Sequence, residues 1–403
     1  MKHRATVYLD NNSTTQCAPE VIEAMLPFFA GNHGNAASPH ILGQQAAGAV
    51  ALARDSIGEL IGCAPSEICF TSCATEANNL VILGLTEVRT KRTKILASAI
   101  EHKSVLGPCE AMAQKGFEFA KLPIGKDGLV DLDWARRLID DRTLLVSVQG
   151  ANNEIGTIQP VRELADIAHE HGAAFHCDAA QLLGKQPVSL DAIGADFASF
   201  SSHKAYGPKG IGFLVTRNRV RNLSIAPIWY GGGQENGLRP GTLNVPGIVG
   251  AGEACRLCNL WLKDDMRRIV SLRLLLEQGF ADLIPESRSI ARDSPRLPGT
   301  VSVMFPGVTA DLLIARTPSL CVSMGSACSS GTVAPSHVLL ALGLSRDEAR
   351  SVVRFSLGRY NTVGDVQTAL RSLSSDLREI FSNDPKPVPN SESVVVAREE
   401  LIP

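Results

Sequence analysis

Short apolar runs alternate with helix-like patterns through the middle of the chain, and this alternation constrains the fold more than any other feature of the sequence. Six apolar runs predict strands, at residues 68–71, 94–97, 144–148, 174–177, 197–200 and 211–215. Three segments with helical spacing or a proline near the first turn predict helices, at residues 44–61, 74–87 and 160–171. Strands and helices that alternate in this way favour an α/β fold, with a mostly parallel sheet covered by helices.

The C-terminal third predicts a second, smaller domain of the α+β type. The pattern from about residue 251 to 280 is helical and more charged, and beyond it we expect strands at 301–305 and 352–356 and a helix at 363–381. The expected organisation is a large domain over 15–255, a small domain from 1–14 and 256–381, and a tail over 382–403. Three alternating prolines exclude a helix in the tail.

Composition excludes several functional classes. The chain has 403 residues, of which 44% are apolar, so it can bury a large core. Its 39 basic and 41 acidic residues leave a net charge of −2, which gives no reason to expect a nucleic-acid binder or a polybasic membrane anchor. No apolar run approaches the ~20 residues that span a bilayer, and the N-terminus has no apolar stretch of secretory length. We expect a soluble, cytoplasmic protein.

The ten cysteines predict neither a disulfide framework nor a metal centre. In a chain of this length they are too sparse for the framework of a small secreted protein. Most lie in apolar surroundings, as Cys69 does, and are expected to be small buried hydrophobic residues. Cys255 and Cys258 form a single CxxC pattern with no second pair and no histidine pair nearby, so we expect no zinc site there.

A lysine and an acid follow two of the predicted strands. Lys204 comes after the strand 197–200 and a run of small polar residues, and Asp178 ends the strand 174–177. A charge at the end of an apolar strand is costly unless it has a partner. A lysine Schiff base and an acid facing a pyridinium nitrogen are what a pyridoxal-phosphate enzyme requires. From the spacing alone, an ordinary buried ion pair is an equal alternative.

A possible phosphate site lies between the predicted strand 68–71 and the helix that begins at Ala74. The turn of small residues would direct backbone N–H groups and the Thr75 hydroxyl at one point, where the positive end of a helix favours a phosphate. The alternative is a plain capping box, with Ser72 or Thr75 as the cap.

Three further segments contain candidate functional groups. Cys328 lies in a run of Gly, Ser and Ala that has little bulk to bury it, and an exposed thiol is unusual unless it is used. The alternative is an incidental surface cysteine. Arg354 lies in a predicted strand and could hold a carboxylate in a bidentate pair. The Gly-rich stretch 231–242 ends in the hydroxyl of Thr242. The last two segments have a purely structural alternative as well.

Together these segments resemble the cysteine desulfurases of the NifS/IscS type, within the class V aminotransferase group of fold-type I pyridoxal-phosphate enzymes. The matching motifs run in the family's order between about residues 7 and 360. They are residues 8–15, Gly34-Asn35 with His40, Ala74-Thr75-Glu76, Glu101-His102-Lys103, 152–156, 178–181, 201–210, Gly241-Thr242, 325–328 and 354–356. The stretch 320–338 resembles the longer catalytic loop of this group.

The resemblance implies a role for each motif. Lys204 would bind pyridoxal 5′-phosphate as a Schiff base, Asp178 would pair with the ring nitrogen, Gln181 would contact the phenolic oxygen, and His102 would stack on the ring and help move protons. The residues implied for the phosphate are Ala74, Thr75, Ser201, His203 and, from the second subunit of a homodimer, Thr242. Arg354 and Asn153 would bind the substrate carboxylate, and Cys328 would be the nucleophile that takes the sulfur.

The implied activity is the conversion of L-cysteine to L-alanine, with a persulfide formed on Cys328 and passed to an acceptor protein. Iron–sulfur cluster assembly, nitrogenase maturation, tRNA thiolation and DNA phosphorothioation all use desulfurases of this kind. The alternatives are a selenocysteine lyase, an aminotransferase of the same fold, or an inactive scaffold that only binds a partner. The sequence departs from the family pattern at Ser13, Ala36, Gly150, Ser202, Tyr230 and Asn236, none of which is assigned to the chemistry.

Overall fold

A computed structural model of the protein describes residues 6–88, 90–217, 224–324 and 335–382. Contacts divide the chain into two compact units. The larger unit comprises residues 14–153 and 157–262, and the smaller unit comprises 1–13, 154–156 and 263–403. The sequence placed the corresponding boundaries after residues 14 and 255, and it did not anticipate that 154–156 would belong with the smaller unit.

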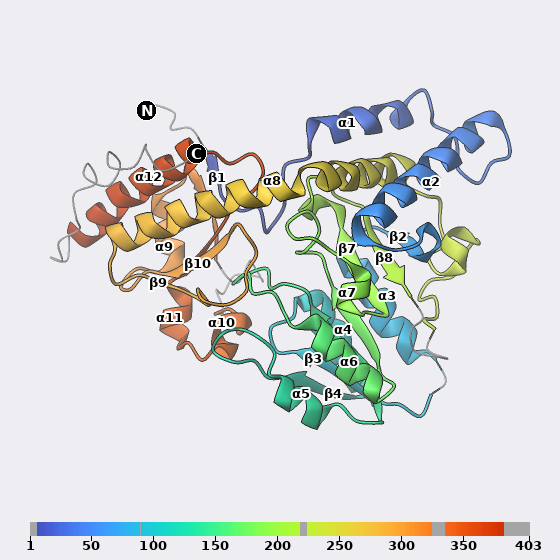
Figure 1. The fold of residues 1–403 in the computed structure, drawn as a ribbon, viewed down its shortest axis with the longest axis horizontal. Helices are drawn as coiled ribbons and strands as arrows, with labels where there is room; N and C mark the ends of the chain where they lie inside the picture. The colour runs from blue at the N-terminus through green and yellow to red at the C-terminus, as the bar shows by residue number, and fades with distance from the viewer. Residues whose placement is uncertain (1–5, 89, 218–223, 325–334, 383–403) are drawn as a thin grey trace. The chain divides into compact units, whose positions relative to one another are not determined.

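The larger unit is built on a seven-stranded sheet (Figure 1). In spatial order the strands are β2 (Ile68–Thr71), β8 (Gly212–Thr216), β7 (Phe197–Ser201), β6 (Ala174–Asp178), β5 (Thr143–Gln149), β3 (Lys94–Ser98) and β4 (Glu118–Leu122). The strands from β7 to β4 run parallel, and β8 is antiparallel to both of its neighbours. The predicted α/β fold with a mostly parallel sheet is confirmed.

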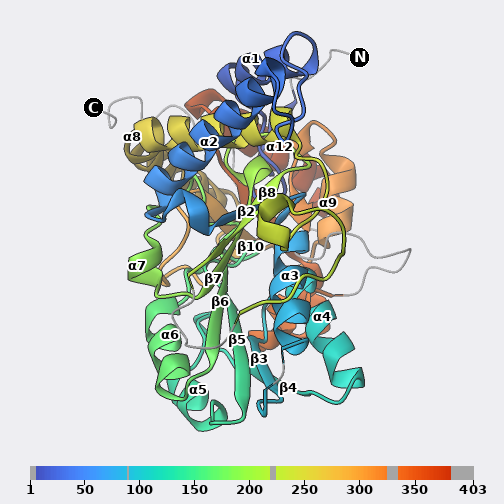
Figure 2. The same cartoon turned by 90° about the vertical axis from the view of Figure 1, so that its right-hand side faces the viewer.

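Helices cover both faces of this sheet, with α3 and α4 on one side and α5 and α6 on the other (Figure 2). The helices of the larger unit are α1 (Pro19–Met25), α2 (Ile41–Ile61), α3 (Ala74–Thr86), α4 (Lys103–Gln114), α5 (Leu132–Leu138), α6 (Val161–Glu170) and α7 (Leu190–Ile193). Short 3₁₀ turns occur at η1 (Leu26–Phe29), η2 (Pro65–Glu67), η3 (Ser202–Lys204) and η4 (Gln234–Gly237). Because both faces are covered, the inner strands are buried along their whole length, as parallel sheets require.

The smaller unit has an antiparallel sheet, in the order β12 (Ser323–Met324), β13 (Val352–Ser356), β10 (Thr300–Met304) and β9 (Arg288–Ser289). A separate parallel pair joins β1 (Val7–Tyr8) to β11 (Leu320–Cys321). Its other helices are α9 (Ala310–Arg316), α10 (His337–Ala341), α11 (Arg346–Arg350) and α12 (Val363–Ser382). The long helix α8 (Val245–Leu283) leaves the larger unit at Leu262 and belongs to the smaller unit from Lys263.

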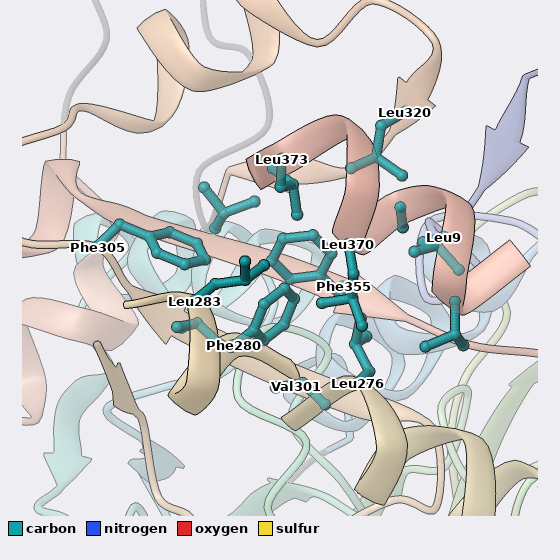
Figure 3. Close-up of a cluster of buried hydrophobic side chains, with 14 of the residues drawn as sticks. Leu9, Leu276, Phe280, Leu283, Val301, Phe305, Leu320, Phe355, Leu370 and Leu373 are labelled. Carbon is teal, nitrogen blue, oxygen red and sulfur yellow. The ribbon is translucent and has the colours of Figure 1, made fainter. Parts of the chain in front are cut away.

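Aromatic side chains fill the core of the smaller unit (Figure 3). Phe280 of α8 packs against Phe305 with ring centroids 5.6 Å apart and against Phe355 of β13 with centroids 4.7 Å apart. Leu370 and Leu373 of α12 belong to the same buried cluster. This packing fixes β13, the strand that contains Arg354. Within the described residues, no helix combines the length and the apolar character needed to cross a bilayer.

Candidate active site

The carboxyl ends of the parallel strands form one edge of the large sheet, and most of the predicted site residues of the larger unit follow these ends. Asp178 ends β6 opposite Gln149 of β5 and Ser199 of β7. Ser201 ends β7, and the segment to His102 follows β3. Ligands of open α/β sheets bind outside the carboxyl ends of the strands. The topology therefore brings together groups that lie up to 102 residues apart, from His102 to Lys204.

Asp178 is a buried carboxylate with two partners. Asp178 is only 7% exposed. Its Oδ2 accepts a hydrogen bond of 2.8 Å from Nδ2 of Asn78 in α3, and its Oδ1 accepts one of 3.1 Å from the backbone N–H of Ala180. These two contacts fix the carboxylate plane at the end of the strand. The charge has the partners that its burial demands.

The beginning of α3 lies beside the end of β7. Thr71 of β2 and Ser201 of β7 both pair with Gly212 of β8, so the two strand ends flank one residue. A Cβ atom at Gly212 would lie 2.7 Å from the carbonyl carbon of Cys73, so only glycine lets the start of α3 pack this closely. Cys73 is the N-cap and supplies no side-chain cap. The capping box that the sequence left open is therefore absent from this helix start.

Ser201 has a buried hydroxyl at this junction. Its Oγ atom has no hydrogen-bond partner within the described part of the chain, and the residue is 2% exposed. A buried hydroxyl without a partner costs about 1–3 kcal/mol. A phosphate oxygen bound at the start of α3 would give this hydroxyl an acceptor. The observation fits a phosphate group at the place where the sequence predicts one.

Lys204 and His203 lie in the 3₁₀ turn η3, which follows β7 directly. The ring of His203 approaches Thr14, with Nδ1 3.1 Å from Oγ1. Burial, and then the Lys204 ammonium, lower the pKa of His203 to about 4. The ring is therefore neutral at neutral pH and can donate one hydrogen bond without adding a charge. Gln181 lies nearby in sequence after Asp178, and its Oε1 accepts a hydrogen bond of 2.5 Å from Lys185.

His102 is the N-cap of α4, and its ring is held by the residue two positions later. The backbone N–H of Ser104 donates to Nδ1 at 3.1 Å, and the Ser104 hydroxyl lies 2.8 Å from the same atom. The side chain is accessible to solvent, yet surrounding protein atoms remove enough water to lower its pKa. The Asp178 carboxylate raises the pKa of His102, and the Lys204 ammonium lowers it.

Glu101, immediately before His102, is fully buried. Its Oε1 accepts a hydrogen bond from the Ser98 hydroxyl and one of 2.8 Å from the backbone N–H of Gln149. Burial and the Asp178 carboxylate raise the pKa of Glu101 to about 8, although both hydrogen bonds act in the opposite direction. Glu101 is therefore mostly protonated at neutral pH.

Arg354 belongs to the smaller unit, in the middle of β13. Its Nη2 lies 2.6 Å from Oδ1 of Asp10 and 2.7 Å from the hydroxyl of Ser13, and its side chain is 4% exposed. Its cross-strand partners are Ser302 of β10 and Ser323 of β12. The planar guanidinium is thus aimed by two groups from the N-terminal segment. One of these groups, Ser13, is a departure from the family pattern.

The remaining predicted residues have less to constrain them. Asn153 is half-buried at the edge of the larger unit, and Thr75 and Thr242 are exposed. Ala74 is the buried first residue of α3. Cys328 lies outside the described residues. No group of three or more His, Cys, Asp or Glu side chains among the described residues is arranged to hold a metal ion.

Sequence reasoning missed several residues that hold the predicted ones in place. Asn78 and Ser104 support Asp178 and His102, and Asp10 supports Arg354. Asp10 lies in the matching motif 8–15, whereas Asn78 and Ser104 follow shortly after the motifs 74–76 and 101–103. The partners of Asn78 and Asp10 are far away in sequence, 100 residues for Asn78 and Asp178, so no local pattern signals these pairs.

Comparisons with known proteins agree with this geometry. The model of the family "Aminotransferase class-V" matches residues 7–369. Cysteine desulfurase IscS of Anaeromyxobacter dehalogenans (strain 2CP-C) is 41% identical over 384 residues, which cover 94% of this chain and 94% of that protein. A solved structure described as a NifS-like protein is similar with a TM-score of 0.87 at 37% identity, covering 93% of this chain and all of that one (100%).

A second solved structure, described as SspA in complex with cysteine, is similar with a TM-score of 0.77 at 34% identity and covers 89% of this chain. These matches extend over nearly the whole sequence and include both units. The chain therefore belongs to the class V aminotransferase family, as a member of its NifS/IscS-type cysteine desulfurases.

Proposed function

We propose that this chain converts L-cysteine to L-alanine and transfers the sulfur to Cys328 as a persulfide, for delivery to an acceptor protein. The observation that supports this most directly is the buried Asp178 carboxylate, fixed by Asn78 and Ala180 one strand away from Ser201 and Lys204. A structural ion pair would explain a buried acid, but not the unpartnered Ser201 hydroxyl beside the start of α3. The cysteine desulfurase named above supplies the reaction class.

Pyridoxal 5′-phosphate, the cofactor of this family, supplies an electron sink for the bonds at Cα of an amino acid. The residues present fit this group. Lys204 would bind it covalently, Asp178 would face the ring nitrogen, and His102 would lie beside the ring. The amide oxygen of Gln181 accepts a hydrogen bond from Lys185, and Gln181 would contact the phenolic oxygen. The residues proposed for the phosphate are Ala74, Thr75, Ser201 and His203.

Arg354 would bind the carboxylate of L-cysteine, together with Asn153. A guanidinium offers five N–H donors in a planar fork, and a carboxylate takes two of them in a bidentate pair. Asp10 and Ser13 fix the plane of the fork through Nη2. The Asp10 carboxylate also balances the charge of the buried arginine. The site would be specific for α-amino acids, because the substrate must offer an amino group to the cofactor bound at Lys204 and a carboxylate to Arg354.

The sulfur transfer needs no external oxidant. The Cβ–S bond of L-cysteine breaks and an S–S bond to Cys328 forms, while the carbon gains a hydrogen and becomes the methyl group of L-alanine. The carbon is reduced by two electrons, and the two sulfur atoms of the persulfide supply one each. A thiolate is the attacking species, so Cys328 must lose its proton first. Lys204 and His102 would move protons at the substrate.

The protein is proposed to act as a homodimer. Large apolar side chains of the larger unit are exposed on α1, η1 and α2, which lie side by side in both views (Figures 1 and 2): Ile22, Leu26, Phe29, Ile41 and Leu52, between 47% and 69% exposed. A cluster of this kind is typical of an interface. Tyr230, 90% exposed, precedes the Gly-rich loop that ends at Thr242.

Two acid–arginine pairs hold this loop in position. Glu235 contacts Arg54 of α2 and accepts a 2.7 Å hydrogen bond from the N–H of Phe70, and Arg239 donates to Glu76 of α3 at 2.8 Å. The loop is thus fixed where it leaves Thr242 exposed. We propose that Thr242 reaches the phosphate site of the second subunit.

The proposed function is tested by incubating the holoenzyme with L-cysteine and measuring alanine together with the mass of the cysteine-containing peptides. One added sulfur on the peptide with Cys328, and its loss together with alanine formation in Cys328→Ser, are expected. The serine variant should still bind the cofactor and L-cysteine. Sulfur on Cys321 or Cys73 instead, or a serine variant as active as the wild type, would show that the nucleophile is misassigned.

A further inference from the structure

A continuous chain of hydrogen bonds links the two side chains proposed for the ring of the cofactor. Both hydrogens of the Asn78 amide are used. One is donated to Oδ2 of Asp178 and the other to Oγ of Ser104, each at 2.8 Å. The Ser104 hydroxyl in turn lies 2.8 Å from Nδ1 of His102. Asn78 is fully buried and Ser104 is 7% exposed, so water does not compete for the two bonds that Asn78 donates.

The direction of each bond can be worked out. A backbone N–H can only donate, so the contact from the Ser104 N–H makes Nδ1 of His102 an acceptor. The Ser104 oxygen already accepts from Asn78, which leaves its hydrogen to donate to Nδ1. The opposite orientation of the Asn78 amide would place its oxygen against the Asp178 carboxylate. In the observed orientation that oxygen, Oδ1, is buried without a partner in the described part of the chain.

We propose that Ser104 and Asn78 are positioning residues that hold His102 in the tautomer with its hydrogen on Nε2 and tie its ring to Asp178. The consequence for the reaction rests on the proposed function, in which His102 lies beside the cofactor. The neutral ring then presents an N–H at Nε2, and it can take up a further proton only at Nδ1, against the Ser104 amide. The charged groups that act on this ring are Asp178 of β6, Lys204 of η3 and Lys103 of α4.

The tautomer can be measured directly on the holoenzyme labelled with ¹⁵N-histidine, with the His102 signals identified by their absence from His102→Asn. We expect the pattern of a neutral ring protonated at Nε2 at pH 7. Ser104→Ala should shift this pattern towards a mixture of tautomers, and Ser104→Thr should restore it. His176 provides an internal reference, since its ring bridges Ser147 and Ser199 at 2.8 and 2.9 Å.

Activity provides the second measurement. Because Ser104→Ala loses one hydrogen bond, we expect its kcat/KM for the conversion of L-cysteine to L-alanine to fall about five- to tenfold. Ser147→Ala is the matched control, because it removes a buried hydroxyl at the same 2.8 Å from Nδ1 of a histidine that has no proposed role; it should stay within about twofold of wild type. The effects of Asn78→Ala and Ser104→Ala should be less than additive, since each breaks the same chain.

A wild-type His102 that is protonated at Nδ1 or doubly protonated at pH 7 would overturn the inference. Equal losses in Ser104→Ala and Ser147→Ala, with the tautomer unchanged, would also overturn it, because they would show a general effect of a lost hydroxyl. The tautomer measurement does not depend on persulfide formation. A wild-type enzyme that shows the expected tautomer but forms no persulfide would instead contradict the proposed function.

Discussion

At the residue scale, the site depends on buried polar groups whose partners set their charge. The Asp178 carboxylate accepts hydrogen bonds from two donors. Glu101, which is buried shortly after the end of β3, is mostly protonated. Burial and the nearby Asp178 carboxylate keep Glu101 neutral, whereas Asp178 is fixed by two donors. This difference can be tested residue by residue.

Lys204→Ala is expected to abolish turnover and to remove the absorbance of cofactor bound through a lysine. The reason is the place of Lys204 in η3, directly after the strand that ends at Ser201. Borohydride reduction followed by peptide mapping measures which lysine is attached. If the variant still traps the cofactor covalently on another lysine, the assignment is wrong. Lys209→Ala, a change in the turn that follows, is the control and should keep the attachment at Lys204.

Asp178→Asn keeps the shape of the side chain and removes its charge. We expect weaker cofactor binding by about 1.5–3 kcal/mol, the range for a hydrogen bond to a charged group, and a lower turnover. Equilibrium dialysis of the cofactor and steady-state rates measure the two effects. Unchanged turnover in this variant would contradict the proposed pairing with the ring nitrogen.

Glu101→Gln is expected to change how stability depends on pH. The carboxyl group has a pKa near 4.5 when unfolded and about 8 in the fold, so the folded state binds the extra proton between these values. Its contribution to stability is therefore present at low pH and is lost as the pH rises through about 8. Thermal unfolding at pH 5.5 and 8.5 should show a smaller alkaline loss in the variant. An identical loss in both proteins would mean that Glu101 is already ionised.

Single residues were predictable from sequence where a strand end and a distinctive neighbourhood coincide. Lys204 and Asp178 fulfil this condition, because each follows an apolar run. Asn78 and Ser104 do not, since a buried amide or hydroxyl resembles any polar helix residue until its partner is known. Asp10 likewise gains its meaning only from the register that brings it to Arg354, 344 residues later.

At the scale of elements, most of the predicted strands and helices lie within a few residues of their predicted bounds. The structure places β2 and β13 at the predicted residues and extends β3, β5, β6 and β7 by one or two residues. Continuous apolar runs in the sequence predict buried strands. The strand β4 was missed because it lies at the sheet edge with Glu118 and Lys121 exposed. The helix α4 was missed because Gly107 and Pro108 interrupt its pattern, and α8 begins six residues earlier than expected, at Val245.

The segment around Cys328 is anchored at both ends within the smaller unit. On one side, Ser323 of β12 pairs with Arg354. On the other, the Ser336 hydroxyl caps α10 and donates to Oε2 of Glu154 at 2.5 Å, while the main chain of Glu154 accepts from Ser302 at 2.7 Å. Residues 325–334 connect these two anchors along the chain.

Glu154→Ala should therefore slow persulfide formation on Cys328 by about tenfold, the cost of a charge-assisted hydrogen bond. Exchange of the α-hydrogen of L-alanine in D₂O, which does not involve Cys328, should stay within about twofold of wild type. Ser336→Ala removes the other partner of this hydrogen bond, but it also removes the cap of α10. Ser345→Ala is the control for the lost cap, because Ser345 caps another five-residue helix of the same unit. If both serine variants lose the same activity, the loss comes from the cap and not from the anchor.

At the scale of the whole molecule, the sequence predicted an α/β domain and a smaller α+β domain, but not the detailed path of the chain between them. Residues 154–156 belong with the smaller unit although they lie in the middle of the larger one in sequence. The hydrogen bonds of Ser302 and Ser336 to Glu154 explain this assignment. No composition or periodicity signals such a short excursion, because three residues are fewer than one turn of a helix.

In the proposed homodimer, each active site would combine residues of both subunits. If Thr242 of one subunit completes the phosphate site of the other, then Lys204→Ala and Thr242→Asp damage different halves of one site. Each variant alone should be nearly inactive, the second because a carboxylate repels the phosphate. In a dimer that combines them, one site has both changes and the other has neither. Random reassembly of an equal mixture should restore about a quarter of the wild-type sites, because half the dimers are mixed and each has one intact site.

The measurement is desulfuration by the two variants after joint denaturation and refolding with the cofactor, compared with each refolded alone. Thr242→Ser is the control, since it keeps the hydroxyl and should be active without a partner. Recovery requires that Thr242 and Lys204 act across the subunit boundary. A mixture that gives only the sum of its parents would place Thr242 in the site of its own chain, and a fully active monomer in light scattering would rule out the shared site altogether. The exposed apolar residues of α1, η1 and α2 provide an independent test: Phe29→Asp, a change in η1 at 65% exposure, should favour the inactive monomer at little cost to its fold.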